Sequence, residues 1–307
     1  MNCGASKQIP INNFRKLAGS VARSPIFARG RVLYTQNRAD CDLPLNSLRK
    51  LQIGLFLILE DYSKGIFPPR FEDRAAAYAA EVAYRESIGL TAAQASEAEM
   101  RKPFWNAFCI ERYLGHYAHL VQSLELVGLR APARLLELGC GTGWMAEWLA
   151  IGGYEVTGTS ISPDDIADAR KRIASVQAKG LQRSLRFEVA PMESVADQLG
   201  PRNHYAGVFV YEALHHAFDW RKALDSGRDC LQPGGWLLIC NEPNLIHTYS
   251  SYRLARLTNT HEIGFSRGEL IGHLRQNGFA DVRYLSSPFH FGIKAHWICA
   301  RKSPLPA

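Results

Sequence analysis

The sequence of 307 residues lacks several features that would assign it to a class at once. Its seven cysteines are scattered, and no two of them have the Cys-x-x-Cys spacing of a zinc or redox site. An odd, dispersed set of thiols is typical of a reducing compartment, so we expect a cytoplasmic protein. A membrane-spanning helix requires roughly 18 consecutive apolar residues, and the strongest apolar run, LQIGLFLILE, has about half of that. We therefore expect no transmembrane helix.

Acidic residues are nearly absent from the first fifty positions. Nine Lys and Arg residues face only Asp40 and Asp42 there, so this arm carries the whole net charge of +7. A basic arm suits peripheral contact with an anionic membrane through residues 1–50, a transit peptide that would place the protein in the mitochondrial matrix, or a solvated tail. The arm has neither interleaved aromatic residues nor a nucleic-acid-binding motif, so no nucleic-acid partner is expected.

Helical spacing of apolar residues begins after this arm. Residues 1–43 are expected to be poorly structured. The spacing predicts three helical regions, the second broken near Gly89: 44–66, 72–100 and 104–127. We therefore divide the chain into the basic arm, a helical extension over 44–127 that is a candidate lid, and a following domain over 128–302.

Strands and helices alternate from residue 128 onward. Short apolar runs predict strands over 134–138, 155–159, 185–189, 205–213, 236–241, 282–285 and 295–300. Helical patterns lie between them, over 144–150, 163–179, 220–231 and 267–277. This alternation predicts an α/β fold with an open, mostly parallel sheet wrapped by helices. The segment between the last two strands is too short for a crossover helix, so these strands should form an antiparallel hairpin at the sheet edge.

The stretch LLELGCGTGW ends the first of these strands in a carboxylate and a glycine-rich loop. Ligands bind such sheets at the carboxyl ends of the strands, and glycines let the backbone approach a ligand closely. The spacing is Gly-x-Gly-x-Gly, whereas dinucleotide folds use Gly-x-Gly-x-x-Gly with an acid about 20 residues further on, where this chain has Ser160. No Gly-Lys-Ser/Thr follows, which excludes a P-loop. An oxidoreductase that uses NAD is therefore disfavoured.

At this loop the chain resembles the class I S-adenosylmethionine-dependent methyltransferases. LLELGCGTGW resembles their first motif, and YEVTGTSISPDDIADARKR resembles their second strand and the helix after it. YAGVFVYEALHHAFDWRKAL and CLQPGGWLLICNEPN are similar to the fourth strand with its loop and to the Pro-Gly-Gly turn with the fifth strand. The late helix GFSRGELIGHLRQNGFADV also matches. The resemblance covers roughly residues 104–300 in order and implies a Rossmann-like seven-stranded sheet.

The resemblance implies S-adenosylmethionine as cofactor and a set of residues around it. Glu137 would lie near its methionine end, the glycine loop beneath it, Met192 and Glu193 beside the adenine, and Tyr211 on the floor. The complete set is Glu137, Gly139, Cys140, Gly141, Gly143, Ser160, Ile161, Met192, Glu193 and Tyr211. Two positions depart from the family pattern: Ser160 stands where an acid usually binds the ribose, and Pro191 where an Asp often binds the adenine. Cyclopropane-type fatty-acid methyltransferases similarly lack the first acid.

The segment YEALHH places His215 and His216 just beyond the fourth strand, as candidate catalytic residues, of which we favour His215. A histidine of near-neutral pKa suits deprotonation of a hydroxyl or amine, although His216 could instead merely order its loop. Polar residues here and after the fifth strand are candidates for binding the acceptor: Glu212, Glu242, Asn244, His247, Arg253 and His261. His247 and His261 stand fourteen positions apart with Glu262 adjacent, and without tight ligand spacing we predict no metal site.

These features lead to two hypotheses. The first is an S-adenosylmethionine-dependent methyltransferase that acts on a small-molecule, sugar or lipid-linked acceptor, most simply at oxygen. The second is a non-catalytic module of the same fold that uses its basic arm to bind a membrane or a partner, motivated by Ser160 and Pro191. The sequence leaves the acceptor, the choice among oxygen, nitrogen and carbon, and the oligomeric state open.

Overall fold

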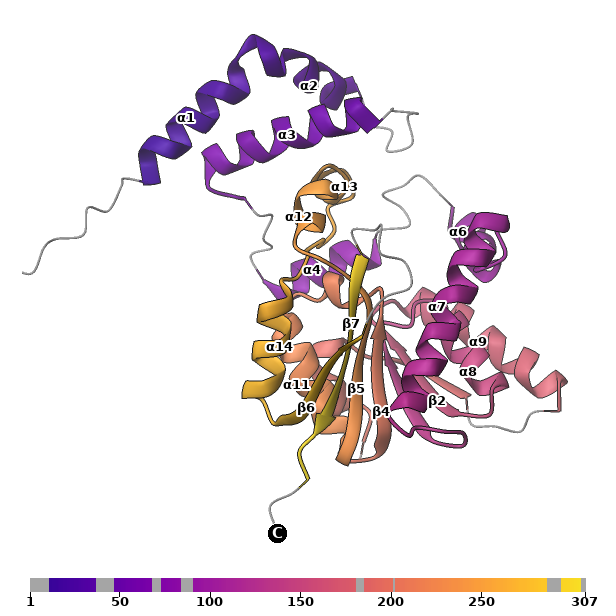
Figure 1. The fold of residues 1–307 in the computed structure, drawn as a ribbon. Coiled ribbons are helices and arrows are strands. Elements are labelled where there is room, and N and C mark those ends of the chain that lie inside the picture. Colours follow the sequence, from indigo (N-terminus) through magenta and orange to yellow (C-terminus); the bar gives the residue numbers. More distant parts are fainter. Residues whose placement is uncertain are drawn as a thin grey trace, which may run out of the picture.

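The structure, a computed structural model, describes residues 11–36, 47–67, 73–83, 91–180, 185–200, 202–285 and 294–304. Its centre is a seven-stranded sheet in the order β3-β2-β1-β4-β5-β7-β6 (Figure 1). The strands are β1 (Arg134–Leu138), β2 (Glu155–Ser160), β3 (Leu185–Val189), β4 (Tyr205–Tyr211), β5 (Leu231–Pro243), β6 (Phe279–Leu285) and β7 (Lys294–Lys302). The first five run parallel, and β7 runs antiparallel to both β5 and β6.

This sheet confirms the expected fold class, with the antiparallel pair β6 and β7 at its edge. The segment that joins the pair, 286–293, lies outside the described residues. The strand that differs most from the expectation is β5, which begins at Leu231 and not at Trp236. Its first residue pairs with Tyr205 across a register shift, so the Pro-Gly-Gly turn lies within the strand as an irregularity.

The helices that follow the strands lie close to the positions that the sequence patterns predicted. The helices are α1 (Ile11–Arg23), α2 (Pro25–Gln36), α3 (Ser47–Lys64), α4 (Arg74–Val82), α6 (Ala92–Met100), α7 (Ala107–Leu126), α8 (Trp144–Ile151), α9 (Pro163–Ala178), α10 (Val195–Gln198), α11 (Trp220–Cys230), α12 (Ile246–Ser250), α13 (Tyr252–Thr258) and α14 (Arg267–Gln276), with short 3-10 turns η1 (Met192–Ser194) and η2 (Leu214–His216). Side-chain caps start several of them: Thr91 forms a capping box at α6, and Asp219 accepts two backbone N–H groups at α11.

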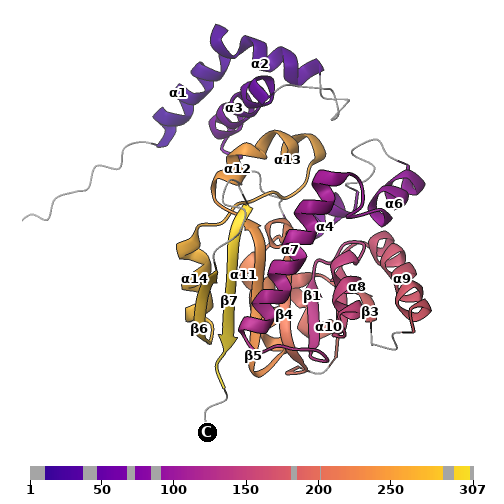
Figure 2. The same ribbon diagram turned by 45° about the vertical axis from the view of Figure 1, so that its right-hand side comes forward.

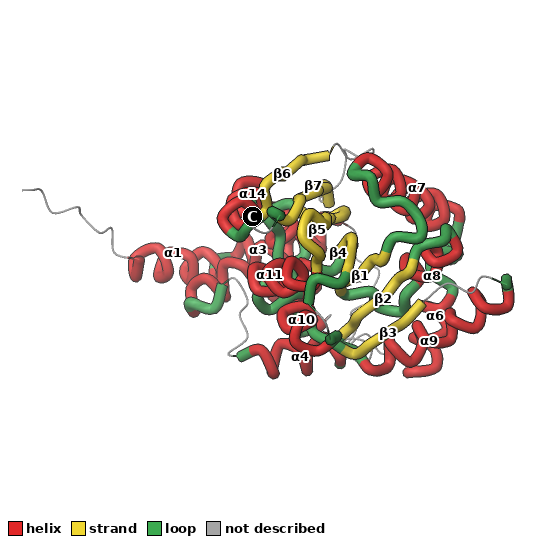
Figure 3. The backbone as a smooth tube through the Cα atoms, turned by 90° about the horizontal axis from the view of Figure 1, so that it is seen from below, coloured by secondary structure: helices red, strands yellow, loops and turns green. Residues whose placement is uncertain are grey.

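The two faces of the sheet bury separate hydrophobic clusters, because successive side chains of a strand point to opposite faces. Leu135 and Phe209 pack with α7, α8 and α9, whereas Leu136 and Val208 pack with α10, α11 and α14. Figure 3 shows the helices on either side of the sheet. Strands covered on both faces read as continuous apolar runs, which explains why the strand positions were evident in the sequence.

The basic arm corrects an expectation. Residues 1–43 were expected to be poorly structured, but α1 and α2 are regular helices; residues 1–10 and 37–43 lie outside the described residues. Both helices pack on α3, with Ala22 buried against Ile53 and Phe56. At Gly30 a β-carbon would lie 2.9 Å from the carbonyl oxygen of Gln52, so glycine permits the close approach of α2 to α3. Within the described ranges, no helix combines the length and apolar character needed to cross a membrane.

Helices α1 to α3 sit on the insertion that follows β5, which contributes α12 and α13 (Figures 1 and 2). The contact centres on Asp61 of α3, which is only 1% exposed. It accepts a hydrogen bond from the Tyr252 hydroxyl (2.7 Å) and lies 2.8 Å from the Arg256 guanidinium. The buried ring of Tyr252 also joins the cluster around Ile53. The N-terminal helices are therefore anchored to the segment that carries most of the candidate acceptor-binding residues.

Candidate active site

A cavity opens at the carboxyl ends of the central parallel strands, where ligands of open α/β sheets bind. It contains about 720 Å³ of space, part of which is open solvent. The cavity is lined by Tyr78, Glu81, Gly139, Gly141, Ser160, Ile161, Ser162, Asp165, Ala190, Met192, Glu193, Glu212, Ala213, His216 and Ala217. Eight of the residues proposed from the sequence are therefore in its wall: Gly139, Gly141, Ser160, Ile161, Met192 and Glu193 from the cofactor set, Glu212 from the acceptor set, and the candidate catalytic His216.

The three glycines of the loop have different roles. All have positive φ: +69° at Gly139, +52° at Gly141 and +74° at Gly143. A β-carbon at Gly139 would lie 2.6 Å from that of Ala213, and one at Gly143 would lie 2.5 Å from the Phe187 ring. At Gly141 no atom lies within 4 Å of that position. Gly139 and Gly143 therefore permit close packing, whereas Gly141 leaves open space in the cavity wall for a ligand.

Four residues expected near the cofactor do not line the cavity: Gly143, which packs against Phe187, and the buried Cys140, Tyr211 and Glu137. The Cys140 thiol is buried, and burial raises its pKa well above the usual value. The Tyr211 hydroxyl lies 2.7 Å from Nδ1 of His116 of α7. Glu137 is 2% exposed, and burial raises the pKa of its carboxyl to about 8. One Glu137 oxygen has no hydrogen-bond partner in the described part of the chain. An uncompensated buried carboxyl is costly, so this oxygen is suited to accept from a ligand donor.

The end of β2 carries the main feature that the sequence interpretation missed. Ser160 accepts a hydrogen bond from the backbone N–H of Ser162 (3.2 Å), and Ser162 in turn caps α9 by accepting from the Asp165 N–H (3.2 Å). This cap turns the chain so that Asp165, in the first turn of α9, lines the cavity. The signal was present in SPDD, a helix start with acidic residues in its first turn. The Asp165 carboxylate therefore lies near the position where Ser160 replaces the usual acid, with its Oδ2 3.5 Å from the Ser160 hydroxyl.

Helix α4 closes one side of the cavity from the N-terminal extension. The Tyr78 hydroxyl donates to Glu193 Oε2 (2.5 Å), and the Asp219 N–H at the start of α11 donates to Glu193 Oε1 (3.1 Å). Burial, followed by the bond to Glu193, raises the pKa of Tyr78. Glu193 therefore joins α4 to the core of the domain, and Tyr78 and Glu81 of α4 become part of the wall.

Two strained residues lie at the strand tips on the other side of the cavity. Glu212 after β4 and Asn241 near the end of β5 have positive φ, +47° and +53°, a conformation that non-glycine residues rarely adopt. Glu212 Oε1 accepts from the Arg112 guanidinium and from the Asn241 side-chain amide, both at 2.7 Å. Such strain persists only where surrounding contacts impose it, and it concentrates at functional sites.

The two candidate catalytic histidines occupy different environments. His216 lines the cavity; its Nδ1 lies 3.0 Å from the His261 carbonyl oxygen and 3.3 Å from Glu81 Oε2. His215 is 2% exposed and does not line the cavity, and its Nδ1 lies 2.9 Å from Glu242 Oε2. Of the two, only His216 can meet a ligand in this cavity, so the preference for His215 was wrong, because His215 is buried behind the wall and bonded to Glu242.

Glu242 requires a correction, because it was expected to contact the acceptor. Its side chain is fully buried and accepts backbone N–H groups of Ala213 (2.8 Å) and Leu214 (2.9 Å) as well as the bond from His215. A carboxylate with several short donors is held in one orientation. Glu242 therefore fixes the loop after β4 and is a positioning residue.

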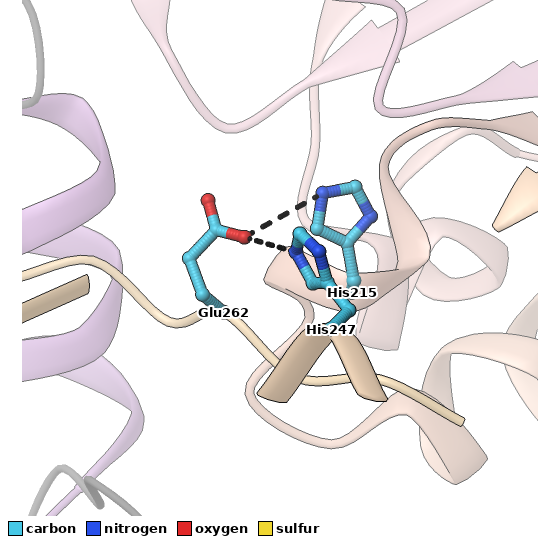
Figure 4. Close-up of side chains that lie close together, drawn as sticks. All are labelled: His215, His247 and Glu262. Carbon is cyan, nitrogen blue, oxygen red and sulfur yellow. Dashed lines mark hydrogen bonds and ion pairs between the residues drawn. The ribbon is translucent and has the colours of Figure 1, made fainter. Parts of the chain in front are cut away.

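The other candidate acceptor residues lie in the insertion after β5, outside the cavity wall. Asn244, just before α12, accepts from the Ile246 N–H (3.0 Å), and Arg253 is on α13. The His261 N–H donates to Glu81 (2.6 Å), and burial lowers the pKa of the His261 ring. His247 Nε2 lies 2.8 Å from Glu262 Oε2, next to His215 (Figure 4). The fold thus gathers two histidines and a carboxylate, although no metal-ligand spacing is visible in the sequence.

Comparison with known proteins identifies the family of this fold and cavity. Residues 110–284, more than half of the chain, match the family model described as Methyltransferase domain. The chain belongs to this family, the class I S-adenosylmethionine-dependent methyltransferases, whose cofactor is S-adenosylmethionine. A magnesium protoporphyrin IX methyltransferase from Synechocystis PCC 6803, solved with bound SAM, has the same fold, with a TM-score of 0.52 and 18% identity over 74% of this chain and 97% of that one.

Two curated relatives illustrate the range of the family. An S-adenosyl-L-methionine-dependent Diels-Alderase of Talaromyces variabilis is 28% identical over 58% of this chain and 63% of its own length. A ubiquinone biosynthesis O-methyltransferase of Bordetella avium is 27% identical over 50% of this chain and 65% of its own length. The chain thus spans less than two thirds of the length of either relative.

Proposed function

We propose that this protein transfers the methyl group of S-adenosylmethionine to a hydroxyl group of a small organic acceptor. The main support is the cavity at the strand tips, whose wall includes open Gly141 on one side and Glu212 and His216 on the other. Similarity to a ubiquinone biosynthesis O-methyltransferase supports oxygen as the methylated atom. Sugar and lipid-linked acceptors remain within the proposal, because the polar insertion after β5 borders the same site.

The residues present fit the cofactor. S-adenosylmethionine, when bound, supplies a methyl group on a cationic sulfonium, which is open to in-line attack by a nucleophile. The open backbone at Gly141 leaves room beneath it, and the unpartnered oxygen of Glu137 is suited to its ammonium group. Asp165, in the cavity wall, would accept hydrogen bonds from ribose hydroxyls in place of the missing acid at Ser160. Met192 offers an apolar contact for the adenine.

His216 is the proposed general base. When its Nδ1–H donates to the His261 carbonyl, the lone pair of the neutral ring is at Nε2. We propose that Nε2 accepts the proton of the acceptor hydroxyl as the oxygen attacks the methyl group. Most of the rate enhancement would come from alignment of the two reactants in the cavity, with proton removal contributing typically about 10²–10⁴-fold.

We also propose that the protein makes peripheral contact with an anionic lipid surface. Helix α1 exposes Phe14, Leu17 and Val21 on one face, with Arg15 and Lys16 beside them. An open hollow against α3 is lined by Arg15, Lys16, Gly19, Arg23 and Ser63. Exposed apolar groups bordered by cations match the chemistry of a membrane interface, and such contact would supply lipid-linked acceptors.

The test of the cofactor site is Gly141→Arg, measured by calorimetric titration with S-adenosylmethionine. The new side chain would enter open space in the cavity wall, and we expect binding heat to be lost. Gly180→Arg is a matched control, because Gly180 has φ of +70° and open space but lies after α9 outside the cavity. Absence of binding in the wild type, or equal binding by Gly141→Arg, would refute the cofactor site.

The transfer itself is tested by incubating wild-type protein and His216→Asn with labelled cofactor and a metabolite extract. We expect adenosylhomocysteine and an O-methylated product from the wild type, and a rate at least about 10²-fold lower in the variant with its cofactor affinity retained. Cofactor binding with no turnover on any acceptor would favour the non-catalytic module.

A further inference from the structure

Three side chains that are far apart in the sequence converge beside the cavity. His215 follows β4, His247 lies on α12, and Glu262 lies in the segment before α14 (Figure 4). Their ligand atoms all lie within 4.8 Å of one another. His247 Nε2 is 2.8 Å and His215 Nε2 is 3.9 Å from the same oxygen, Glu262 Oε2. The side chain of His215 is only 3% exposed, that of His247 13% and that of Glu262 11%.

His215 is already oriented as a metal ligand. Its Nδ1 lies 2.9 Å from Glu242 Oε2, and Glu242 is itself held by two backbone N–H groups. A carboxylate that accepts from Nδ1 fixes the tautomer and directs the Nε2 lone pair away, here toward Glu262. This carboxylate–histidine pair is the usual outer shell of a metal-bound imidazole.

Glu262 provides the negative charge that such a site requires. The oxygen Oε2 of its carboxylate lies 2.8 Å from His247 Nε2 and 3.9 Å from His215 Nε2, so both imidazoles face the same oxygen. An ion about 2.0–2.2 Å from each ligand atom would require these atoms to lie roughly 3–4 Å apart. The distance from His215 Nε2 to Glu262 Oε2, 3.9 Å, is in this range, and that from His247 Nε2, 2.8 Å, is slightly shorter.

We propose that His215 Nε2, His247 Nε2 and Glu262 Oε2 bind a divalent transition-metal ion of the zinc class. Two imidazoles and one carboxylate form a set that favours Zn²⁺ and related ions over Mg²⁺ and Ca²⁺, which prefer oxygen ligands. Three protein ligands leave at least one coordination position open. The ion would link the loop after β4 to both ends of the insertion after β5. This inference does not depend on the proposed methyl transfer.

The site borders the proposed reaction site through His216. The rings of His215 and His216 lie 4.2 Å apart, and His216 Nε2 lies 3.8 Å from Glu262 Oε1. Glu262 thus faces His215 and His247 with Oε2 and His216 of the cavity wall with Oε1. A bound ion at the cluster would hold Glu262 in place and so position His216, whether or not an acceptor coordinates it.

The experiment uses the full chain, stripped with a chelator and titrated with Zn²⁺ by competition with a chromophoric chelator. We expect one ion per chain, bound at least about 100-fold more weakly by His247→Gln and Glu262→Gln, since even outer-shell changes cost about 10–100-fold in metal affinity. Co²⁺ should give visible absorption bands in the wild type that are lost in both variants. Mg²⁺ should not compete.

His204→Gln is the matched control, since His204 lies before β4, outside the cluster, beside Arg134. It should bind Zn²⁺ as the wild type does. Circular dichroism and calorimetric binding of S-adenosylmethionine verify that each variant is folded, because neither His247 nor Glu262 lines the cofactor cavity. Zn²⁺ binding that is equal in wild type and the folded His247→Gln and Glu262→Gln variants, or absent in wild type, would mean a hydrogen-bonded cluster only and overturn the proposal.

Discussion

At the scale of residues, several side chains of the candidate site have roles that their position in the sequence did not predict. Glu137 is the acid of the first motif, yet it is buried with one unpartnered oxygen. Asp165 was not a candidate, yet it lines the cavity. Glu242 was a candidate for acceptor contact, yet every described bond of its side chain goes to the loop after β4. Burial and hydrogen bonding, rather than residue type, determine these roles.

Glu137 should make the unliganded protein less stable as pH rises. Its folded-state pKa of about 8 lies above the ordinary value of 4.5, so the folded state retains a proton that the unfolded chain releases. The free energy of unfolding should therefore fall between the ordinary and the raised pKa, by on the order of a few kcal/mol. Glu137→Gln, which is neutral at every pH, should lack this decline.

Urea unfolding of the cofactor-free protein at several pH values across this window measures the effect. The exposed Glu111→Gln on α7 serves as the control and should keep the wild-type decline. A pH profile shared by the wild type and Glu137→Gln would show that Glu137 does not titrate as described.

At the scale of elements, the N-terminal helices, the insertion after β5 and α4 surround a standard sheet. Helix α4 contributes Tyr78 and Glu81 to the cavity, and α3 anchors α13 through Asp61. The insertion carries His247 and Glu262 between these supports. The elements outside the sheet therefore form much of the acceptor side of the site.

Tyr252→Phe should weaken the attachment of α3 to α13. The substitution removes the hydroxyl that donates to Asp61 Oδ2 at 2.7 Å in a buried contact, and bonds to charged groups contribute about 1.5–3 kcal/mol. We expect the free energy of unfolding, measured with urea, to fall by that amount. Tyr249→Phe, at a 51% exposed tyrosine on α12, should change it by less than about 0.5 kcal/mol. Equal effects of the two substitutions would contradict an anchoring role for Tyr252.

At the scale of the whole molecule, charge and exposed apolar surface coincide at the N-terminal end. Net charge is +7, and the first fifty residues account for it. Figures 1 and 2 show α1 to α3 above the insertion, on the side opposite the C-terminus. A lipid surface contacted by α1 would thus face the end of the molecule where the cavity and the insertion lie.

Wild-type protein should sediment with vesicles of anionic lipid, less so at high salt, and not with neutral vesicles. The double variant Lys16→Glu/Arg23→Glu should bind about tenfold or more weakly, since each cation near an anionic surface contributes about 1 kcal/mol. Arg275→Glu, an exposed charge reversal on α14, should behave as wild type. Equal sedimentation of the double variant and wild type would refute the contact.

Local sequence patterns were sufficient to predict the sheet and the family. Buried strands read as apolar runs, and Gly139 to Gly143 form a contiguous loop, so both signals lie within a few neighbouring residues. The sequence interpretation missed helices α1 and α2 because they are rich in basic residues and have only a narrow apolar face. Ala22, on this face, packs on α3. Small buried residues give little signal in a charged segment.

The cluster of side chains beside the cavity could not be predicted from local patterns, because it depends on the path of the chain. His215, His247 and Glu262 meet only because β4 and β5 are neighbours and the insertion folds back over their ends. The same path buries Glu137 and brings Tyr78 to Glu193 across more than a hundred residues. Periodicity and motifs report contacts between residues close in sequence, since they reflect strand and helix geometry. Contacts between distant residues depend on how those elements pack, which no local pattern records.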